Sequence, residues 1–361
     1  YETIAASAGP DHRVRGTLQF YGASRTGRWA GRLLQVQNLP RTYLDHQAEW
    51  RSIVKLHDPE ALALLTDNVS DTLSQLIRTA LVPGEGCTFV DADFSAIEAR
   101  LIAWLSGEDW VLDVFRTTGK IYEATAARIF GVPFDSIVKG NPNYKYRQRG
   151  KVATLALGYQ GGVGAMKRMG GDQLGLDDEG LQDIVNRWRR QNPRICKLWQ
   201  TMQTAAVLTI RTGQTVRARK GVFLRKEAVP GFPFPFLTMQ LPSGRKLFYA
   251  APGTTPDNRI TYKEWDNGGW REAETYGGKL TENLTQAVGR DCLAFALDNL
   301  RRAGYRVVFH VHDEVIIELP DTQDADAALQ DVVRIMSIVP PWAEGLPLNA
   351  AGWHGDFFTK D

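Results

Sequence analysis

The chain has 361 residues, of which 43% are hydrophobic and 23% are charged, enough apolar material for one large core or for two or three smaller ones. We therefore expect a folded globular protein. Its net charge of +2 is too small to indicate a polyanionic partner, and no stretch approaches the roughly 18 continuous apolar residues of a membrane span.

Basic residues are concentrated in two regions. Eighteen Lys and Arg against five Asp and Glu lie between 139 and 226, and six arginines lie between 13 and 41. This distribution is typical of a protein that holds phosphates along one face, although a solvated basic surface fits it as well.

The cysteines and the N-terminus bear on the compartment. Cys87, Cys196 and Cys292 are far apart and odd in number, so we predict free thiols in a reducing compartment. The N-terminus has no signal-peptide pattern, so we expect a cytoplasmic protein. Since the chain opens with Tyr1 instead of Met, we also expect it to be the C-terminal part of a longer protein.

Apolar periodicity predicts alternating strands and helices between Pro/Gly-rich segments. In chain order these are a strand over 87–94, helices over 95–107 and 144–159, strands over 245–250 and 259–265, a long helix over 279–304, and two strands within 307–320. Strands near both ends and a basic helical middle predict an α+β core that carries a helical insertion.

Two aspartates stand where predicted strands end, Asp93 in "VDADF" and Asp313 in "VHDEV". Two carboxylates held by fixed strands can share divalent cations, and a pair of Mg²⁺ ions about 3.5–4 Å apart can clamp the attacking and leaving oxygens of a phosphoryl transfer. Alternatively, Asp93 starts a helix and Asp313 forms a hairpin turn, with no further role.

Four residues at intervals of four form a stripe on the helix predicted over 144–159: Arg147, Lys151, Leu155 and Tyr159. Successive members drift by only about 40°, so they share one face. Cations beside an apolar and an aromatic side chain suit a nucleoside triphosphate. The alternative is a solvated basic face with Leu155 and Tyr159 in the core.

Three segments in this order, "DFSAIEAR", "RQRGKVATLALGY" and "VHDEV", resemble motifs A, B and C of the family A DNA polymerases, which include bacterial DNA polymerase I. "TGRWAGRLLQVQNLP" (26–40) is similar to a further segment of that family, and "ENLTQAVGRD" is most like phage or prophage members. The resemblance covers the chain from near residue 15 to the C-terminus.

The resemblance implies a right-hand polymerase with an antiparallel palm sheet and inserted helical fingers. We expect a palm over 1–110 and 228–361 and fingers over 111–227. The family's thumb precedes the "TGR" segment, so we expect it to be largely missing here. The implied reaction is template-directed addition of dNTPs to a primer 3′-hydroxyl with release of pyrophosphate, by a protein that works as a monomer on primer-template DNA in a bacterial or phage-infected cell.

Site roles follow from the resemblance. Asp93 and Asp313 would hold two Mg²⁺ ions, with Mn²⁺ as a possible substitute, and the carbonyl of Phe94 would add a ligand. Arg147 and Lys151 would hold the triphosphate, and Lys151 could also donate a proton to the departing pyrophosphate.

Two roles are expected for Glu98. Ser95 and Glu98 have the spacing of a helix capping box, and by resemblance Glu98 is the steric gate that excludes the 2′-hydroxyl of a ribonucleotide.

Two positions depart from the cellular family. Leu155 stands where Phe or Tyr is usual, and Tyr122 stands in place of a phosphate-contacting His.

DNA contacts are implied for Arg28 of the "TGR" segment and for Gln286, which would read minor-groove acceptors at the primer terminus. Asn283 and His312 are further candidates. His310 and His312 could instead bind zinc, although no third ligand stands at a suitable spacing.

Two other functions stay open on the sequence. The related single-subunit phage RNA polymerases share the two aspartates and the Arg/Lys helix, but Glu98 argues against ribonucleotides. A non-catalytic primer-template binding module is the other alternative.

Overall fold

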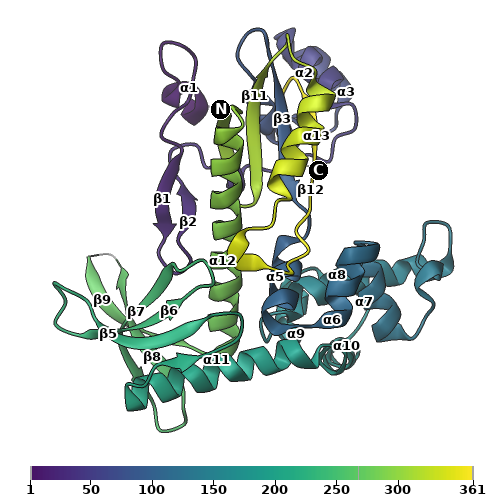
Figure 1. The fold of residues 1–361 in the computed structure, drawn as a ribbon. Helices are drawn as coiled ribbons and strands as arrows, with labels where there is room; N and C mark the ends of the chain where they lie inside the picture. Colours follow the sequence, from purple (N-terminus) through teal and green to yellow (C-terminus); the bar gives the residue numbers. More distant parts are fainter. Residues whose placement is uncertain (1, 267, 360–361) are drawn as a thin grey trace. The chain divides into compact units, whose positions relative to one another are not determined.

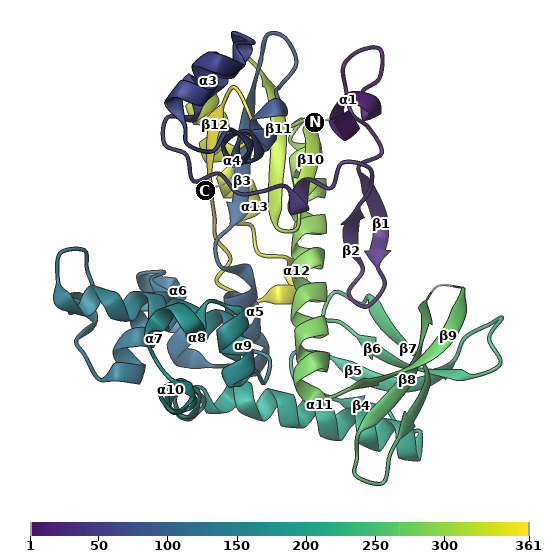
Figure 2. The same ribbon diagram turned by 180° about the vertical axis from the view of Figure 1, so that it is seen from behind.

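The computed structural model describes residues 2–266 and 268–359. The chain folds into two compact units (Figures 1 and 2). The first unit is formed by Tyr1–Ser95, Leu293–Ile338 and Asn349–Asp361, and the second unit by Ala96–Cys292 and Val339–Leu348.

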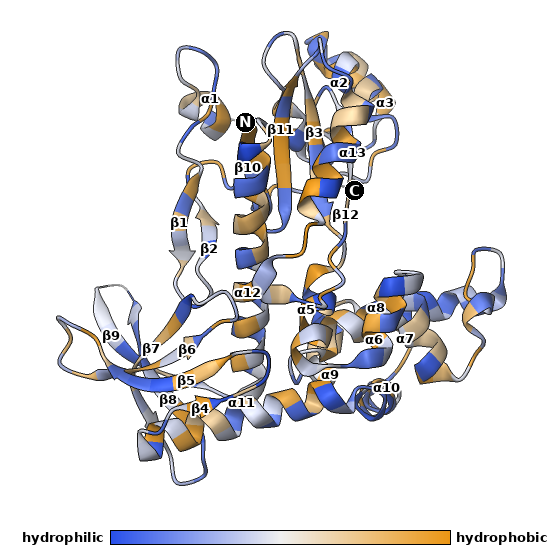
Figure 3. Ribbon diagram, viewed as in Figure 1, coloured by the Kyte–Doolittle hydropathy of each residue, from blue (hydrophilic) through white to orange (hydrophobic). Residues whose placement is uncertain are grey.

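A four-stranded antiparallel sheet forms the centre of the first unit, in the order β10-β11-β3-β12. Its strands are β3 (Cys87–Phe94), β10 (Val307–Val311), β11 (Glu314–Pro320) and β12 (Ala350–Gly355). β3 and β11 pair along their whole length, from Cys87 opposite Pro320 to Asp93 opposite Glu314. Both lie in the middle of the sheet, and every residue of β11 except Pro320 is buried. Most of the strand is hydrophobic (Figure 3).

The two faces of this sheet carry different side chains. Val90, Ala92, Val315 and Ile317 share one face and are almost fully buried. Helix α13 (Ala325–Met336) packs along β3 and β12 (Figure 1). The opposite face carries, in register, Asp93 beside Glu314, Asp91 beside Ile316 and Phe89 beside Glu318.

Smaller elements complete the first unit. β1 and β2 form an antiparallel hairpin, and the loop between β2 and β3 carries short helices. These elements are α1 (Glu2–Ser7), β1 (Leu18–Ala23), β2 (Arg28–Gly31), α2 (Gln47–Lys55), α3 (Pro59–Leu65) and α4 (Val69–Gln75).

The first half of the second unit is helical. Its core contains Leu157, Met166, Leu181 and Trp188, and the Trp188 ring stacks near that of Trp199 with centroids 6.2 Å apart. The helices are α5 (Ile97–Ser106), α6 (Asp109–Thr117), α7 (Ile121–Phe130), α8 (Lys145–Leu157), α9 (Val163–Arg168), α10 (Asp178–Gln191) and α11 (Pro193–Thr212).

Helices α7 and α8 touch at Gly150. A Cβ at Gly150 would lie 2.2 Å from the carbonyl oxygen of Tyr122 and 2.9 Å from the Cβ of Ala126. Only glycine therefore permits this approach of the two backbones. Beside it, Thr154 Oγ1 donates to Thr125 Oγ1 at 3.2 Å.

The second half of this unit is a six-stranded antiparallel sheet, which packs on α11. Its inner face is apolar and includes Leu224, Leu237, Met239 and Tyr249. The strands are β4 (Val216–Arg217), β5 (Phe223–Ala228), β6 (Pro235–Gln240), β7 (Lys246–Thr254), β8 (Ile260–Asp266) and β9 (Gly269–Thr275), followed by α12 (Gly277–Arg302).

The predicted fold class is confirmed, because a central antiparallel sheet is interrupted by a helical insertion. The helices predicted over 95–107, 144–159 and 279–304 are α5, α8 and α12, and the strand predicted over 87–94 is β3. Most of the second sheet was not predicted. Only β7 and β8 were expected there.

Candidate active site

Asp93 and Asp313 lie side by side at one end of the sheet of the first unit. Asp93 is the last residue but one of β3, and Asp313 is the second residue of the two-residue turn that joins β10 to β11. The backbone N–H of Phe94 donates to the carbonyl oxygen of Asp313 at 3.2 Å. Since His312 opens this turn with φ +55°, the tight hairpin fixes the backbone that carries the second aspartate.

A third carboxylate stands at this end of the sheet. Glu314 is the partner of Asp93 in the β11–β3 register, and directly opposed residues have Cβ atoms about 4.5–5.5 Å apart. Its side chain is 2% exposed. Glu314 interacts electrostatically with Arg78, whose pKa is lowered by burial against the opposing effect of Glu314. Its place beside Asp313 in the sequence is the signal from which this third carboxylate could have been predicted.

These carboxylates fit a divalent cation that keeps other ligands. Among the described residues, no group of three or more His, Cys, Asp or Glu side chains is arranged to hold a metal by itself. Mg²⁺ is commonly bound by one or two carboxylates together with water and substrate phosphate oxygens. Oxygen donors from Asp93 and Asp313 therefore suit Mg²⁺ better than zinc, which prefers nitrogen and sulfur.

Helix α8 carries the cationic stripe predicted from the sequence. Arg147, Lys151 and Leu155 lie within it, and Tyr159 follows its last residue by two positions. Leu155 is 47% exposed, which leaves an open apolar surface beside the cations. Among the described residues no carboxylate forms an ion pair with Lys151, whereas Arg147 has one.

The partner of Arg147 is Glu123 on α7. Arg147 Nε donates to Glu123 Oε1 at 2.7 Å, and this hydrogen bond raises the pKa of Arg147. The guanidinium also lies 5.6 Å from the ring centroid of Tyr122, and burial raises the pKa of the Tyr122 hydroxyl. Tyr122 is thus placed beside the cationic stripe. Glu123 was not predicted, since it is 24 residues from Arg147.

Glu98 lies in the first turn of α5 and accepts a hydrogen bond of 2.9 Å from the Tyr159 hydroxyl. Burial, together with Glu98, raises the pKa of Tyr159 well above its usual value, so Tyr159 stays a neutral donor. The N-cap residue of α5 is Ala96, with φ +51°. The predicted capping box with Ser95 as the N-cap is therefore wrong, since the cap lies one residue later and makes no side-chain hydrogen bond.

The candidate DNA-contacting residues have different surroundings. Asn283 is 5% exposed and its amide donates to Tyr249 Oη at 2.9 Å, so it faces the interior of the second unit. Gln286, one turn further along α12, is partly exposed. Arg28 is the first residue of β2 and is partly exposed, and His312 is exposed.

Three further expectations from the sequence concern His310, the cysteines and the absence of a membrane span in the described part of the chain. His310 packs edge-on against Trp29 with ring centroids 4.7 Å apart. The three cysteines are free thiols, as predicted. No described helix is both long enough and apolar enough to cross a membrane.

Comparison with known proteins identifies relatives of this chain. The model of DNA polymerase family A matches residues 2–227. A DNA polymerase of Bacillus phage SP02 is 48% identical over 359 residues, which cover 98% of this chain and 53% of that polymerase. The thermostable DNA polymerase I of Thermus aquaticus is 24% identical over 282 residues, 78% of this chain and 28% of that enzyme.

A solved structure gives the same result for the fold. It is described as the POL domain of Pol1 from M. smegmatis in complex with DNA primer-template and dNTP. It aligns with a TM-score of 0.64 over 99% of this chain and 50% of that one, at 18% sequence identity. The chain thus spans about half the length, or less, of the relatives that it matches.

Proposed function

The chain belongs to DNA polymerase family A, and on this premise we propose that it is a DNA-directed DNA polymerase that extends a primer 3′-hydroxyl with dNTPs. The observation that carries the proposal is the juxtaposition of Asp93 and Asp313 at the end of the β3–β11 pair. Within the family fold, we assign the palm to 1–110 and 228–361 and the fingers to 111–227.

Asp93 and Asp313 would hold two Mg²⁺ ions, and the carbonyl oxygen of Phe94 would add a ligand. When bound, such ions polarise the α-phosphate and favour the ionised 3′-hydroxyl. The protein's own contribution is rigid placement. Phe94 is 3% exposed and its amide is bonded to the Asp313 carbonyl, so the two aspartates keep their spacing before substrate arrives.

Arg147 and Lys151 would bind the triphosphate. Lys151, which has no carboxylate partner among the residues described, can give its full charge to a phosphate and can donate a proton to the departing pyrophosphate. Arg147 must exchange Glu123 for the phosphate. Leu155 offers apolar contact to the base where a ring is usual, and Tyr122 takes the position of a phosphate-contacting His.

Glu98 would select the sugar. Its carboxylate is oriented by the Tyr159 hydroxyl, and a carboxylate fixed over C2′ leaves no room for a ribonucleotide 2′-hydroxyl. Discrimination against one hydroxyl by a fixed group of this kind is the reason that we propose dNTPs over rNTPs. Primer-template contacts are assigned to Arg28 and Gln286.

The deciding experiment is primer extension. The chain, purified as a monomer, is given a primed template, labelled dNTPs and Mg²⁺, with parallel reactions that contain EDTA or rNTPs. We expect template-dependent extension that EDTA abolishes and that rNTPs do not support. Tight binding to the primed template without any extension would instead favour a non-catalytic binding module.

A further inference from the structure

A groove of about 950 Å³ crosses the second unit beside helix α11. It shares no residue with the candidate active site. One wall is α11, the other is the turn between β7 and β8, and the floor is formed where α12 begins.

The α11 wall presents a polar stripe. Lys197, Gln200, Gln203 and Thr204 line the groove at helical spacings of three and four, so they share one face. From Pro193 to Thr204 the lined segment is about 16 Å long at 1.5 Å per residue. The lined segment of α11 is therefore longer than a small anion needs.

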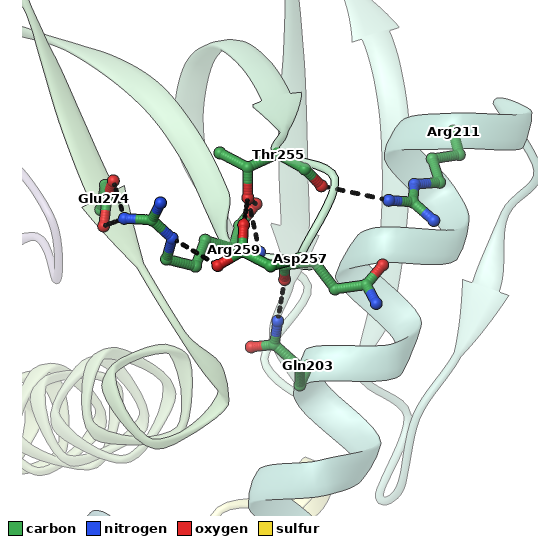
Figure 4. Close-up of polar contacts among 7 residues, drawn as sticks. Gln203, Arg211, Thr255, Asp257, Arg259 and Glu274 are labelled. Atoms are coloured by element: carbon green, nitrogen blue, oxygen red, sulfur yellow. Dashed lines mark hydrogen bonds and ion pairs between the residues drawn. The ribbon is translucent and has the colours of Figure 1, made fainter.

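The opposite wall is tied to α11 by hydrogen bonds (Figure 4). Gln203 Nε2 donates to the carbonyl oxygen of Asn258 at 2.7 Å, and Arg211 Nη2 donates to that of Thr255 at 3.3 Å. Within the wall, Arg259 pairs with both Asp257 and Glu274 at 2.9 Å. These bonds fix the width of the groove.

The floor depends on two glycines. A Cβ at Gly277 would lie 2.0 Å from the carbonyl oxygen of Trp199, and one at Gly278 would lie 2.5 Å from the Cβ of Gln160. Their amides donate to side-chain oxygens, Gly277 to Gln203 and Gly278 to Gln160. Tyr276 lines the groove beside these glycines and is 50% exposed.

The groove carries an excess of positive charge. It is lined by four cationic side chains and one carboxylate, Asp257, which is paired with Arg259. In the described part of the chain, no ion pair joins Arg189, Arg190 or Lys197 to a carboxylate. Arg189 Nε, moreover, is buried without a hydrogen-bond partner among those residues.

We propose that this groove binds a segment of single-stranded DNA, with its phosphates on Arg190 and Lys197 and a base against the exposed ring of Tyr276. A cationic groove that tracks the backbone, with an aromatic ring for stacking, is the general chemistry of single-strand binding. Arg189, whose Nη2 donates to the carbonyl oxygen of Gly161 at 3.0 Å, adds a third positive charge to the lining. A mononucleotide would occupy only part of a wall of this length.

The proposal rests on the proposed function in one respect: the single strand that a polymerase meets is its unpaired template. The groove would then hold template outside the active site. Binding is tested with a labelled oligo(dT) of 20 nucleotides in fluorescence anisotropy, which requires no polymerase activity. Its outcome is thus separate from that of primer extension.

The test compares the double variant Arg190→Glu, Lys197→Glu with a matched double variant Lys139→Glu, Lys263→Glu, whose residues are exposed and lie outside the groove. Oligo(dT) affinity should fall at least ten-fold in the groove variant and no more than two-fold in the control. The slope of log Kd against log[salt] should also decrease by about 1.4, because about 0.7 counterions are released per single-strand phosphate contact and the variant loses two such contacts. Tyr276→Ala should weaken binding about five-fold or more.

Melting temperatures establish that each variant is folded. Millimolar dTTP in competition separates a strand from a free nucleotide, and it should displace little oligo(dT). Equal affinities of the groove and control variants, or complete displacement by dTTP, would overturn the proposal. If the protein extends primers, the ratio of extension on 20-nucleotide to 1-nucleotide template overhangs should fall in the groove variant.

Discussion

The hydroxyl of Tyr159 donates a 2.9 Å hydrogen bond to Oε2 of Glu98, joining the residue two positions beyond α8 to the first turn of α5. The two residues are 61 positions apart in the sequence. The bond helps to orient the Glu98 carboxylate, and it adds a contact that a helix cap alone would not require.

Replacing Glu98 by Ala should relax sugar selection. The shorter side chain opens the space beside C2′, so kcat/KM for a matched rNTP relative to its dNTP should rise at least ten-fold, about 1.4 kcal/mol. Single-nucleotide addition to one primed template measures the ratio. Tyr159→Phe removes only the hydroxyl and should raise the ratio less. An unchanged ratio in folded Glu98→Ala would leave Glu98 with a structural role only.

Asp93→Asn and Asp313→Asn should each abolish extension and leave primer-template affinity within a few-fold, because the proposed DNA contacts lie on other residues. Asp321→Asn is the matched control. Asp321 follows β11 at the other end of the sheet, where it bonds Thr88, so this variant should extend normally. More than a tenth of the normal rate with Mg²⁺ in either aspartate variant would contradict the metal assignment.

Lys151→Ala should lose far more extension rate than Lys139→Ala. Lys151 belongs to the cationic stripe of α8, whereas Lys139 is exposed in the loop before this helix. Loss of a charge-assisted phosphate contact should cost about 2–4 kcal/mol in the transition state, read from kcat/KM for dNTP. Equal and mild losses at both positions would indicate that the stripe is a solvated surface.

Glu318 should make the first unit sensitive to acid. Burial raises its pKa, but the Gly84 amide, Arg13 and Arg306 outweigh that effect, and the net pKa lies below 4.5. A lowered folded pKa stabilises the protein above the unfolded pKa, and this stability is lost as the pH falls through the folded value.

The free energy of unfolding of Glu318→Gln, measured in urea at pH 7, should therefore be lower than that of the parent. The expected loss is about 2 kcal/mol, because hydrogen bonds to a charged group are lost. The difference from the parent should begin to shrink below about pH 4.5. Glu85→Gln, which removes a carboxylate at an exposed loop position, is the control and should unfold like the parent in urea at pH 7. A constant difference between Glu318→Gln and the parent down to pH 3.5 would exclude the titration of Glu318 as its cause.

The sequence predicted those features that depend on local pattern. Apolar runs ending in Asp93 and Asp313 identified β3 and the β10–β11 hairpin, and the spacing of Arg147 and Lys151 identified the α8 stripe. Both signals lie within fewer than 20 consecutive residues. The order of the motifs then indicated the family, which comparison confirmed.

Features that depend on tertiary contacts were not predictable in this way. β6 begins at Pro235 within a Pro/Gly-rich segment that resembled a loop, although proline is tolerated as the first residue of a strand. β5 contains the charged run Arg225–Lys226–Glu227, which conceals its alternation. The pairing of Arg147 with Glu123 and the groove beside α11 arise only when distant segments meet.

The contact at Gly150 has a mechanical consequence. Two helices separated by side chains can slide as rotamers change, but α7 and α8 meet with no side chain between them at this point, and the Arg147–Glu123 pair and the Thr154–Thr125 bond lie on either side of it. Helices α7 and α8 should therefore move together as one rigid body. A movement of α8 that brings Lys151 toward a substrate should therefore carry Tyr122 of α7 with it.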